Sequence, residues 1–164
     1  MEIKKTSAII AAIAFILSAQ TLTRNQAWRS ETSLWSDISF LSPGKARPRY
    51  NLGTIYHRHG DIDSAIKEYK KAVGIDPSFY LALNNLGYAY FKKGLFKEAI
   101  NEYKKALEFS PKDPDVRYNL AMAYAATGLK KKAREEFLLV LSIIPGDPDT
   151  TRELAKITGR STVK

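Results

Sequence analysis

Three stretches of this chain are near copies of one another and recur at a fixed interval. They read YNLGTIYHRHG from residue 50, NNLGYAYFKKG from residue 84 and YNLAMAYAATG from residue 118. Four rows of residues keep the same 34-residue interval: Gly53, Gly87 and Ala121; Ala65, Ala99 and Ala133; Gly60, Gly94 and Gly128; and Pro43, Pro77, Pro111 and Pro145. A fixed period of this length predicts a repeat architecture in which each unit stacks on the next.

Each unit contains two helical patterns separated by a glycine. In the middle unit, apolar residues recur with the spacing of one helical face over residues 83–90 and again over residues 96–107. Gly94 lies between them and predicts the end of the first helix, because glycine readily takes the left-handed conformation. Pro111 cannot continue the second helix and predicts the break before the next pair. Each unit is therefore predicted to be a helix–turn–helix.

Small residues recur on both helices of a unit. Gly87 and Ala99 predict points where the paired helices approach closely, since a large side chain there would overpack the contact. We expect Tyr90 and Tyr103 to fill the wider gaps beside these points.

The order of residues in a unit, Leu-Gly-x-x-Tyr followed by Ala, an aromatic residue, Ala and Pro, resembles the tetratricopeptide repeat. The matching residues are Leu52, Gly53, Tyr56, Ala65, Tyr69, Ala72 and Pro77 in the first unit, Leu86, Gly87, Tyr90, Ala99, Tyr103, Ala106 and Pro111 in the second, and Leu120, Ala121, Tyr124, Ala133, Phe137, Val140 and Pro145 in the third. The third unit departs from the family only with Ala121 and Val140. The resemblance implies an all-α, right-handed superhelical α-solenoid that mediates protein–protein interaction.

The predicted organisation follows from the phase of the repeat. We expect a membrane anchor helix over residues 1–24, a linker and half-repeat capping helix over 25–45, repeats over 46–79, 80–113 and 114–147, and a cap helix with a tail over 148–164. The half repeat rests on Pro43, which is in phase and gives SETSLWSDISFLSP the position of a second helix. Trp35 then takes the aromatic position that Tyr69 has in the first repeat, and Ile38 takes the small-to-medium position of Ala72.

The C-terminal stretch DPDTTRELAKITG predicts one more helix. Asp149 or Thr150 is the expected N-cap and Gly159 the expected stop. Leu154 and Ile157 are expected to pack on the third repeat, as the end of a solenoid requires.

An uncharged apolar run lies near the N-terminus. Residues 6–23, TSAIIAAIAFILSAQTLT, lie between Lys5 and Arg24 and as a helix would be about 27 Å long at roughly 1.5 Å per residue, close to a hydrocarbon core of about 30 Å. We favour a retained transmembrane anchor, since lysines precede the run and Trp28 follows at interfacial distance. A cleaved signal peptide ending near Ala19 and a buried helix stay open as alternatives.

The charges beside this run suggest a topology. Lys4 and Lys5 favour a cytoplasmic N-terminus, so the expected localisation is a single-pass membrane protein whose repeats are extracytoplasmic, periplasmic or exterior; Arg24 and Arg29 weaken this bias. The junction RNQAWRSETSLWSDISFLSPGKARPRYNLG resembles the joint in transmembrane-and-tetratricopeptide-repeat proteins, where the last helix of a multi-pass glycosyltransferase-like part leads into repeats. This resemblance implies an accessory or C-terminal portion of a membrane glycosyltransferase system.

The sequence offers little for catalysis. It has no cysteine, which excludes disulfides, thiol catalysis and Cys-based zinc sites. His57 and His59 are the only histidines and would point about 200° apart on a helix, so they cannot share a metal ion. Asp61 and Asp63 are interpreted as charges at a helix N-terminus. We expect no enzymatic activity, no cofactor and no metal site.

Solenoids of this family bind partners on the concave surface lined by their first helices. The residues that family geometry places there are Arg47, Tyr50, Thr54, His57 and Arg58, then Leu81, Asn84, Tyr88, Phe91 and Lys92, then Asp115, Tyr118 and Met122. Of these, the aromatic residues lie outside the rows that build the core, although they could instead pack between neighbouring helices. The pattern favours a protein or peptide partner, extended or helical, with acidic flanks.

One specialised binding mode is testable at this point. Repeat proteins that hold the C-terminal carboxylate of heat-shock chaperones resemble one another in a two-carboxylate clamp of Lys, Asn and Arg. The corresponding positions here are Tyr50, Thr54, Asn85, Asp115 and Asn119, of which only Asn85 matches. The sequence does not predict chaperone-tail binding.

The net charge of +9 and the pI near 9.6 raise the question of acidic partners. Glu68 with Lys71 and Glu102 with Lys105 have the spacing of ion pairs on a solvated helix face. A soluble convex surface is the favoured interpretation, and attraction to anionic lipid headgroups is the alternative. The basic residues are dispersed, so nucleic acid is not an expected partner.

Overall fold

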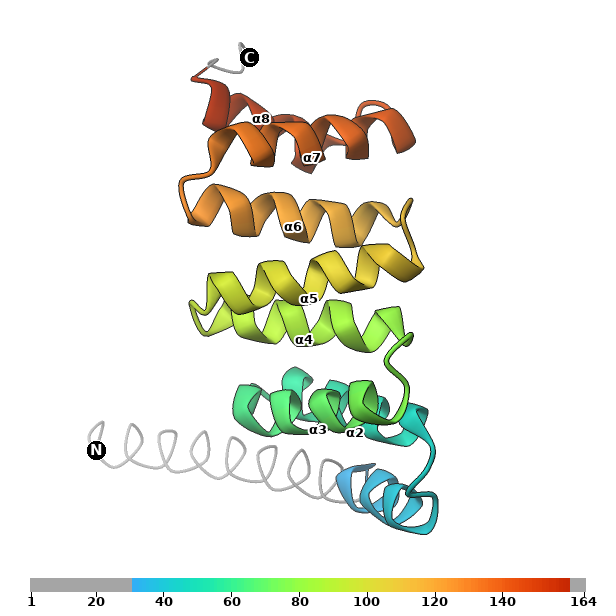
Figure 1. The fold of residues 1–164 in the computed structure, drawn as a ribbon. Coiled ribbons are helices and arrows are strands. Elements are labelled where there is room, and N and C mark those ends of the chain that lie inside the picture. Colours follow the sequence, from blue (N-terminus) through green and yellow to red (C-terminus); the bar gives the residue numbers. More distant parts are fainter. Residues whose placement is uncertain (1–30, 160–164) are drawn as a thin grey trace, which may run out of the picture.

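The computed structural model of the 164-residue chain describes residues 31–159, and this part is all-helical. A helical stretch over residues 31–41 precedes α2 (Ala46–Arg58), α3 (Ile62–Ile75), α4 (Tyr80–Lys92), α5 (Phe96–Phe109), α6 (Pro114–Ala126), α7 (Lys130–Ile143) and α8 (Pro148–Thr158). Figure 1 shows the helices stacked in chain order, and each of α2 to α8 contacts the next. The described chain is an α-solenoid.

The turn inside each hairpin is made by a glycine in the left-handed conformation. Gly60, Gly94 and Gly128 have φ values of 82°, 76° and 77°. At the end of α4, the Gly94 amide donates to the Phe91 carbonyl at 2.9 Å and the Leu95 amide donates to the Tyr90 carbonyl at 3.0 Å. These bonds satisfy carbonyls that the helix end would leave free. The prediction that Gly94 ends the first helix is confirmed.

The two helices of a hairpin touch where a glycine meets an aromatic ring. A Cβ atom built on Gly53 would lie 2.7 Å from the Tyr69 ring, and one on Gly87 would lie 2.7 Å from the Tyr103 ring. The expectation that Tyr103 fills a wider gap beside the close point is therefore wrong, because its ring occupies that point.

The apolar core runs through the stack of helices. One cluster joins the second and third hairpins and includes Leu83, Tyr103, Leu120 and Phe137, all almost fully buried. Two smaller clusters join the first hairpin to α4. Because neighbouring hairpins share their apolar faces, each hairpin depends on the next one for burial.

A row of glutamates is buried between helices, contrary to the expectation of a solvated face. Glu68 is 6% and Glu102 is 9% exposed. Both form the expected pairs, with Lys71 at 2.6 Å and Lys105 at 3.0 Å, but they lie under the surface. The expectation failed because these positions of the repeat face a neighbouring helix, and the spacing of a glutamate to a lysine on its own helix does not reveal that.

Arginines on the first helices pair with this row. Arg49 of α2 lies 3.2 Å from Glu68 of α3, and Arg117 of α6 lies 2.6 Å from Glu136 of α7. The corresponding position of α4 is Leu83, so the middle hairpin lacks this link.

The two ends of the solenoid are built differently. In the stretch 31–41, Trp35 is partly buried, whereas Phe40 is 81% and Leu41 is 78% exposed. At the other end, the N-cap of α8 is Asp147, whose carboxylate accepts the Thr150 amide at 2.8 Å.

The sequence-based choice of Asp149 or Thr150 as the N-cap is therefore wrong, since Pro148 already occupies the first turn. Gly159 ends α8 with a left-handed φ of 69°, as predicted. Leu154 and Ile157 pack against the core cluster, also as predicted.

No helix within residues 31–159 has both the length and the hydropathy needed to cross a membrane. The predicted anchor over residues 6–23 lies outside the described residues.

Candidate functional site

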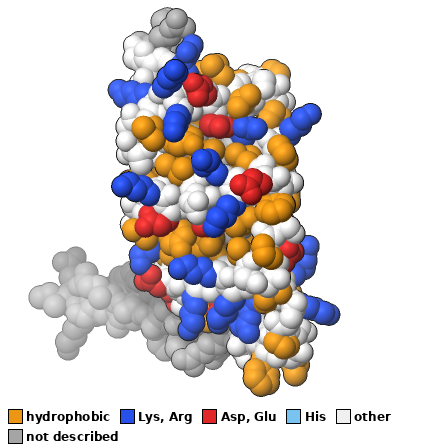
Figure 2. All heavy atoms as spheres, viewed as in Figure 1, with side chains coloured by type: hydrophobic (Ala, Val, Ile, Leu, Met, Phe, Trp, Pro, Cys, Tyr) orange, Lys and Arg blue, Asp and Glu red, His pale blue; other side chains and the backbone are white. Residues whose placement is uncertain are grey.

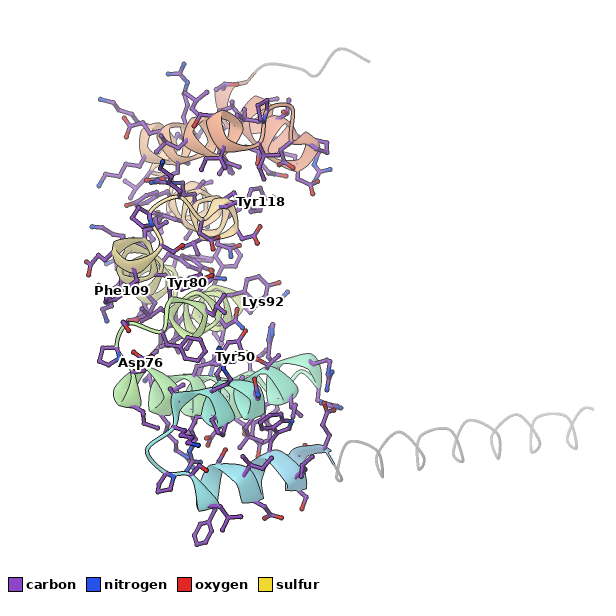
Figure 3. All side chains as sticks on the ribbon, turned by 90° about the vertical axis from the view of Figure 1, so that its right-hand side faces the viewer. Tyr50, Asp76, Tyr80, Lys92, Phe109 and Tyr118 are labelled. Atoms are coloured by element: carbon purple, nitrogen blue, oxygen red, sulfur yellow. The ribbon has the colours of Figure 1, made fainter. Side chains whose placement is uncertain are left out.

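The first helices of the hairpins lie on one side of the solenoid. Figure 3 shows Lys92 of α4 and Tyr118 of α6 on this side, with Asp76 and Phe109 on the opposite side. All of the residues predicted for a concave surface belong to α2, α4 or α6.

A groove between α4 and α6 brings five of these residues together. Its volume is about 200 Å³ and its lining residues are Tyr88, Phe91, Lys92, Tyr103, Tyr118, Asn119 and Met122. We call it the aromatic pocket. Tyr103 was assigned to the core alone, and Asn119 was considered only as a clamp position, so sequence reasoning missed both as groove residues.

Tyr88 lines the aromatic pocket and does not belong to any of the core clusters. Its ring meets the His57 ring edge to face, with 5.3 Å between centroids, and the Lys92 ammonium lies 5.8 Å from its centroid. Burial, and then the charge of Lys92, lower the pKa of His57 below its usual value of 6.5. This end of the pocket therefore has a positive potential.

Other predicted aromatics are part of the packing as well as of the surface. Phe91 contacts Phe96 at 5.3 Å, and Tyr118 contacts Phe137 at 5.7 Å between ring centroids. Both are partly buried against the large core cluster, and Tyr50 is packed on the two smaller ones. The alternative that these aromatics pack between neighbouring helices therefore holds for all three, which lie against the core clusters without belonging to the buried core, because gaps between adjacent hairpins need large side chains to fill them.

The predicted residues of α2 do not line the aromatic pocket. The Arg47 guanidinium lies 5.6 Å from the centre of the Phe79 ring, and Arg58 forms an ion pair with Glu31. Thr54 donates its hydroxyl to the Tyr50 carbonyl at 3.0 Å. The contacts of Arg47 and Arg58 join α2 to the start of α4 and to the stretch 31–41, whereas the Thr54 hydrogen bond lies within α2.

Asparagines link adjacent hairpins along the same side. The Asn119 amide donates to the Asn84 side-chain oxygen at 3.1 Å, and the Asn85 amide donates to the Tyr50 hydroxyl at 3.3 Å. In both cases the partners are 35 residues apart in sequence. A search for polar pairs one repeat plus one residue apart would have found Asn119.

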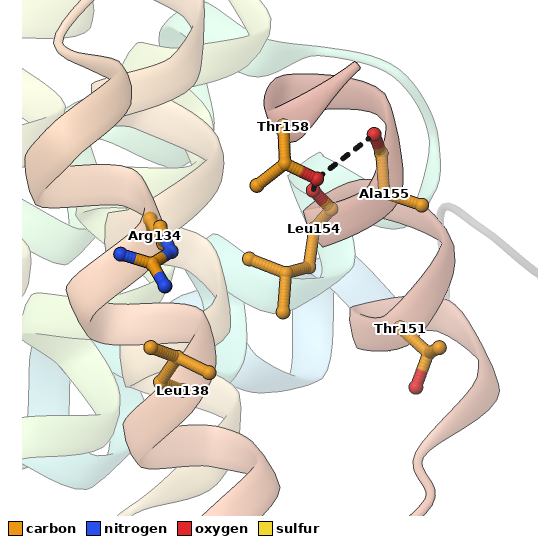
Figure 4. A pocket seen from close by; sticks show the side chains of 6 residues that line it. All are labelled: Arg134, Leu138, Thr151, Leu154, Ala155 and Thr158. Carbon is orange, nitrogen blue, oxygen red and sulfur yellow. Dashed lines mark hydrogen bonds between the residues drawn. The ribbon is translucent and has the colours of Figure 1, made fainter. Parts of the chain in front are cut away.

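A second hollow lies at the C-terminal end of the solenoid, between α7 and α8 (Figure 4). Its volume is about 450 Å³, and it is lined by Arg134, Leu138, Thr151, Leu154, Ala155 and Thr158. Leu138 is 44% exposed. The Thr158 hydroxyl donates to the carbonyls of Leu154 and Ala155 at 2.8 and 3.2 Å, so it is already engaged. The hollow therefore offers a mainly apolar lining.

Neither histidine lies in a metal-binding group. Within residues 31–159, no three His, Asp or Glu side chains lie close enough together to hold a metal ion. His57 packs on Tyr88, and the His59 ring lies beyond the end of α2, with Nδ1 2.8 Å from the Ile55 carbonyl.

Asp61 is the N-cap of α3, as predicted, and accepts the Ser64 amide at 3.1 Å. Asp63 lies in the first turn of that helix.

Basic side chains are spread over the solenoid. On the face in Figure 2, Lys and Arg side chains alternate with acidic and hydrophobic ones and do not form a single stripe. This face has none of the continuous positive surface on which nucleic acids bind.

The repeats match models of a known family. The TPR repeat model matches residues 53–94 and 89–128, and the tetratricopeptide repeat model matches residues 114–147. A Caenorhabditis elegans protein O-mannosyl-transferase, F38B6.6, is 30% identical over 79 residues, which are 48% of this chain. The chain spans only 11% of the length of that relative.

Solved structures agree on the fold. The first TPR domain of Spaghetti (RPAP3), bound to the HSP90 peptide SRMEEVD, is 26% identical with a TM-score of 0.69, over 70% of this chain and 91% of that one. MamA, 23% identical with a TM-score of 0.78, covers 84% of this chain and 82% of its own. The match to the family models, the 34-residue rows and the stacked hairpins together show that this chain belongs to the tetratricopeptide repeat family.

Proposed function

We propose that this chain is a scaffold without catalytic activity that binds a peptide or helix of a partner protein on the side of α2, α4 and α6. The observation that carries the proposal is the aromatic pocket, where Tyr88, Phe91, Tyr118 and Met122 surround a cavity of about 200 Å³ next to Lys92. Aromatic side chains that line a pocket often contribute most of the binding energy in protein recognition.

The charge beside the aromatic pocket suits an acidic flank on the partner. Lys92 is exposed and forms no ion pair with any carboxylate in residues 31–159. The similar domain of Spaghetti holds a peptide ending in acidic residues. At the positions where chaperone-binding repeats hold a C-terminal carboxylate, this chain has Thr54, Asn85 and Asn119, which form hydrogen bonds within the solenoid. We therefore expect a ligand other than a chaperone C-terminus.

Replacing one aromatic side chain tests the pocket. We expect Tyr88→Ala in the full chain to weaken partner capture about tenfold or more, because a truncated anchor typically costs 1–2 kcal/mol or above. Tyr88 is absent from the core clusters, so the fold should survive. Phe109→Ala is the matched control, as Phe109 is 48% exposed on the opposite side.

Crosslinking in native membranes, followed by identification of the captured proteins, gives the readout for both variants. Equal capture by wild type and Tyr88→Ala would reject the pocket as the binding site.

We further propose that the N-terminal run tethers the repeats to a membrane, with the repeats on the extracytoplasmic side. The charge-free length of residues 6–23 supports this proposal. A tethered solenoid would also hold its basic surface near anionic headgroups. Sequencing the mature N-terminus separates an anchor, which keeps Met1, from a cleaved signal peptide, which would leave a start near Gln20.

A second candidate function is an accessory part in a membrane glycosyltransferase system. The similarity to the protein O-mannosyl-transferase over 79 residues favours it. Purification of the full chain from its own membranes should then enrich a multi-pass sugar transferase, and its absence would count against this candidate.

A further inference from the structure

A second cavity of about 250 Å³ adjoins the aromatic pocket and has the opposite charge. It is lined by Pro114, Asp115, Tyr118, Val140, Ile144, Asp147, Asp149 and Thr150. Three carboxylates and no basic side chain are among these residues. We call this cavity the acidic pocket. It lies where the starts of α6 and α8 meet the end of α7.

The acids of this pocket are only partly neutralised by the solenoid. Asp149 pairs with Arg152 at 2.6 Å, whereas Asp115 has no Lys or Arg within ion-pair distance in residues 31–159. Asp147 uses one oxygen to accept the Thr150 amide. The Thr150 side chain is fully buried next to the Asp147 carboxylate, and its hydroxyl helps to lower the pKa of Asp147. Acceptors are thus in excess over donors in this cavity, which is the environment that a Lys or Arg side chain satisfies.

Tyr118 lines both cavities, so the two lie next to each other and have this side chain as a common wall. At one end the Lys92 ammonium lies over the Tyr88 ring. At the other end Asp115, Asp147 and Asp149 line the acidic pocket. The groove therefore changes from positive at the end of α4 to negative at the start of α8.

We propose that the groove binds a partner segment in which an acidic residue, an apolar side chain and a Lys or Arg follow one another in this order or its reverse. The apolar side chain enters the aromatic pocket, the acidic residue faces Lys92, and the basic residue enters the acidic pocket. The inference rests on the proposed peptide-binding function and adds the charge order of the peptide. Opposite potentials at the two ends select one orientation and reject the other by like-charge contact.

The first experiment finds ligands without assuming a partner. Random twelve-residue peptides are displayed on phage and selected against the full chain, and peptides that fail to bind Tyr88→Ala are retained as groove-dependent. We expect these peptides to carry Asp or Glu on one side of an apolar residue and Lys or Arg on the other. Groove-dependent peptides with acids on both sides, or with no charge bias, would overturn the inference and leave the proposed function standing.

The second experiment exchanges the charges. For one selected peptide, Lys92→Glu and Asp115→Lys should each weaken binding about fivefold by fluorescence anisotropy, as expected for exposed charges. The protein with both substitutions should prefer the same peptide with its acidic and basic residues exchanged. Asp115→Asn provides a neutral variant in case a lysine in the first turn of α6 destabilises the helix.

Glu108→Lys is the matched control for Asp115→Lys, because it makes the same charge change at an exposed site of α5 that lines neither cavity. If both peptides bind the double variant equally, the charge order is wrong although the pocket binds peptide. If no selected peptide depends on Tyr88, the proposed function fails, and the inference fails with it.

Discussion

Gly53 and Gly87 each lie against the ring of a tyrosine from the second helix of the same hairpin. Tyr69 and Tyr103, the two tyrosines, are 0% and 1% exposed, so both rings are held inside the protein against these glycines. The third hairpin has Ala121 and Phe137 at the same places, both fully buried. The small residue sets how deeply the ring can enter, and the ring then fixes the distance between the paired helices.

The first prediction compares two glycines in helices. Gly87→Ala should destabilise the fold, since its Cβ would lie 2.7 Å from the Tyr103 ring and overpacking costs about 1–3 kcal/mol. Gly74→Ala should stabilise it by about 0.5–1 kcal/mol, because Gly74 lies inside α3 with nothing within 4 Å of an added Cβ.

Thermal unfolding followed by circular dichroism measures both, at roughly 2–8 °C per kcal/mol. Equal shifts of the two variants would show that Gly87 does not set the helix separation.

Between elements, the first and third hairpins each have an arginine that joins their two helices, and the middle hairpin has none at that position. Arg117 joins Glu136 of α7 at 2.6 Å and also donates to the Pro111 carbonyl at 2.6 Å. The side chains of Arg117 and Glu136 are 18% and 20% exposed, so water screens the pair only in part. This arginine therefore links the loop before α6, the helix α6 itself and α7.

The second prediction concerns this link. Arg117→Ala should destabilise the fold by about 1–2 kcal/mol, because it leaves the partly buried Glu136 without its partner. Lys131→Ala, at an exposed position of α7, should change stability by less than about 0.5 kcal/mol. Urea denaturation of both variants, of Glu136→Gln and of the double variant Arg117→Ala/Glu136→Gln closes a double-mutant cycle. A coupling energy of zero would mean that the pair does not stabilise the hairpin.

In the whole solenoid, buried phenols recur from one end to the other. Burial is the main cause that raises the pKa of Tyr69, Tyr103, Tyr118 and Tyr124 above the usual value of 10.0. The neutral phenols are therefore favoured in the folded chain, whereas the unfolded chain releases these protons as the pH rises past about 10.

The third prediction follows from this sign. The free energy of unfolding should be constant with respect to these groups below about pH 10 and should fall as the pH rises above it. Tyr103→Phe should reduce the slope, since it removes one of the phenols. Urea midpoints between pH 8 and 11 measure the effect. An unchanged slope in Tyr103→Phe would show that this phenol titrates equally in the folded and unfolded chains.

Residue patterns predicted much of the fold because the repeat places the same chemistry at the same phase. The glycine turns and the packing of Leu154 and Ile157 followed from local spacing. The N-cap of α8 was missed by two or three residues, since Pro148 occupies the first turn and the N-cap is Asp147. The burial of Glu68 and Glu102 was missed because an i,i+3 pair with lysine looks the same on a buried face and on a solvated one.

The site was predicted only in outline. Family geometry named five of the residues that line the aromatic pocket, but it also named α2 residues that are engaged in packing. The acidic pocket was not predicted, since Asp115 of α6 and Asp149 of α8 are 34 residues apart and belong to different hairpins.

The sequence by itself determined the period, the helical hairpins and the family, because helix spacing, turn glycines and small contact residues act over a few positions of the chain. The tertiary structure decided which side chains are free to meet a partner and which carboxylates share a cavity. Stacking one hairpin on the next sets those distances, and the positions of neighbouring hairpins depend on packing across the whole interface between them.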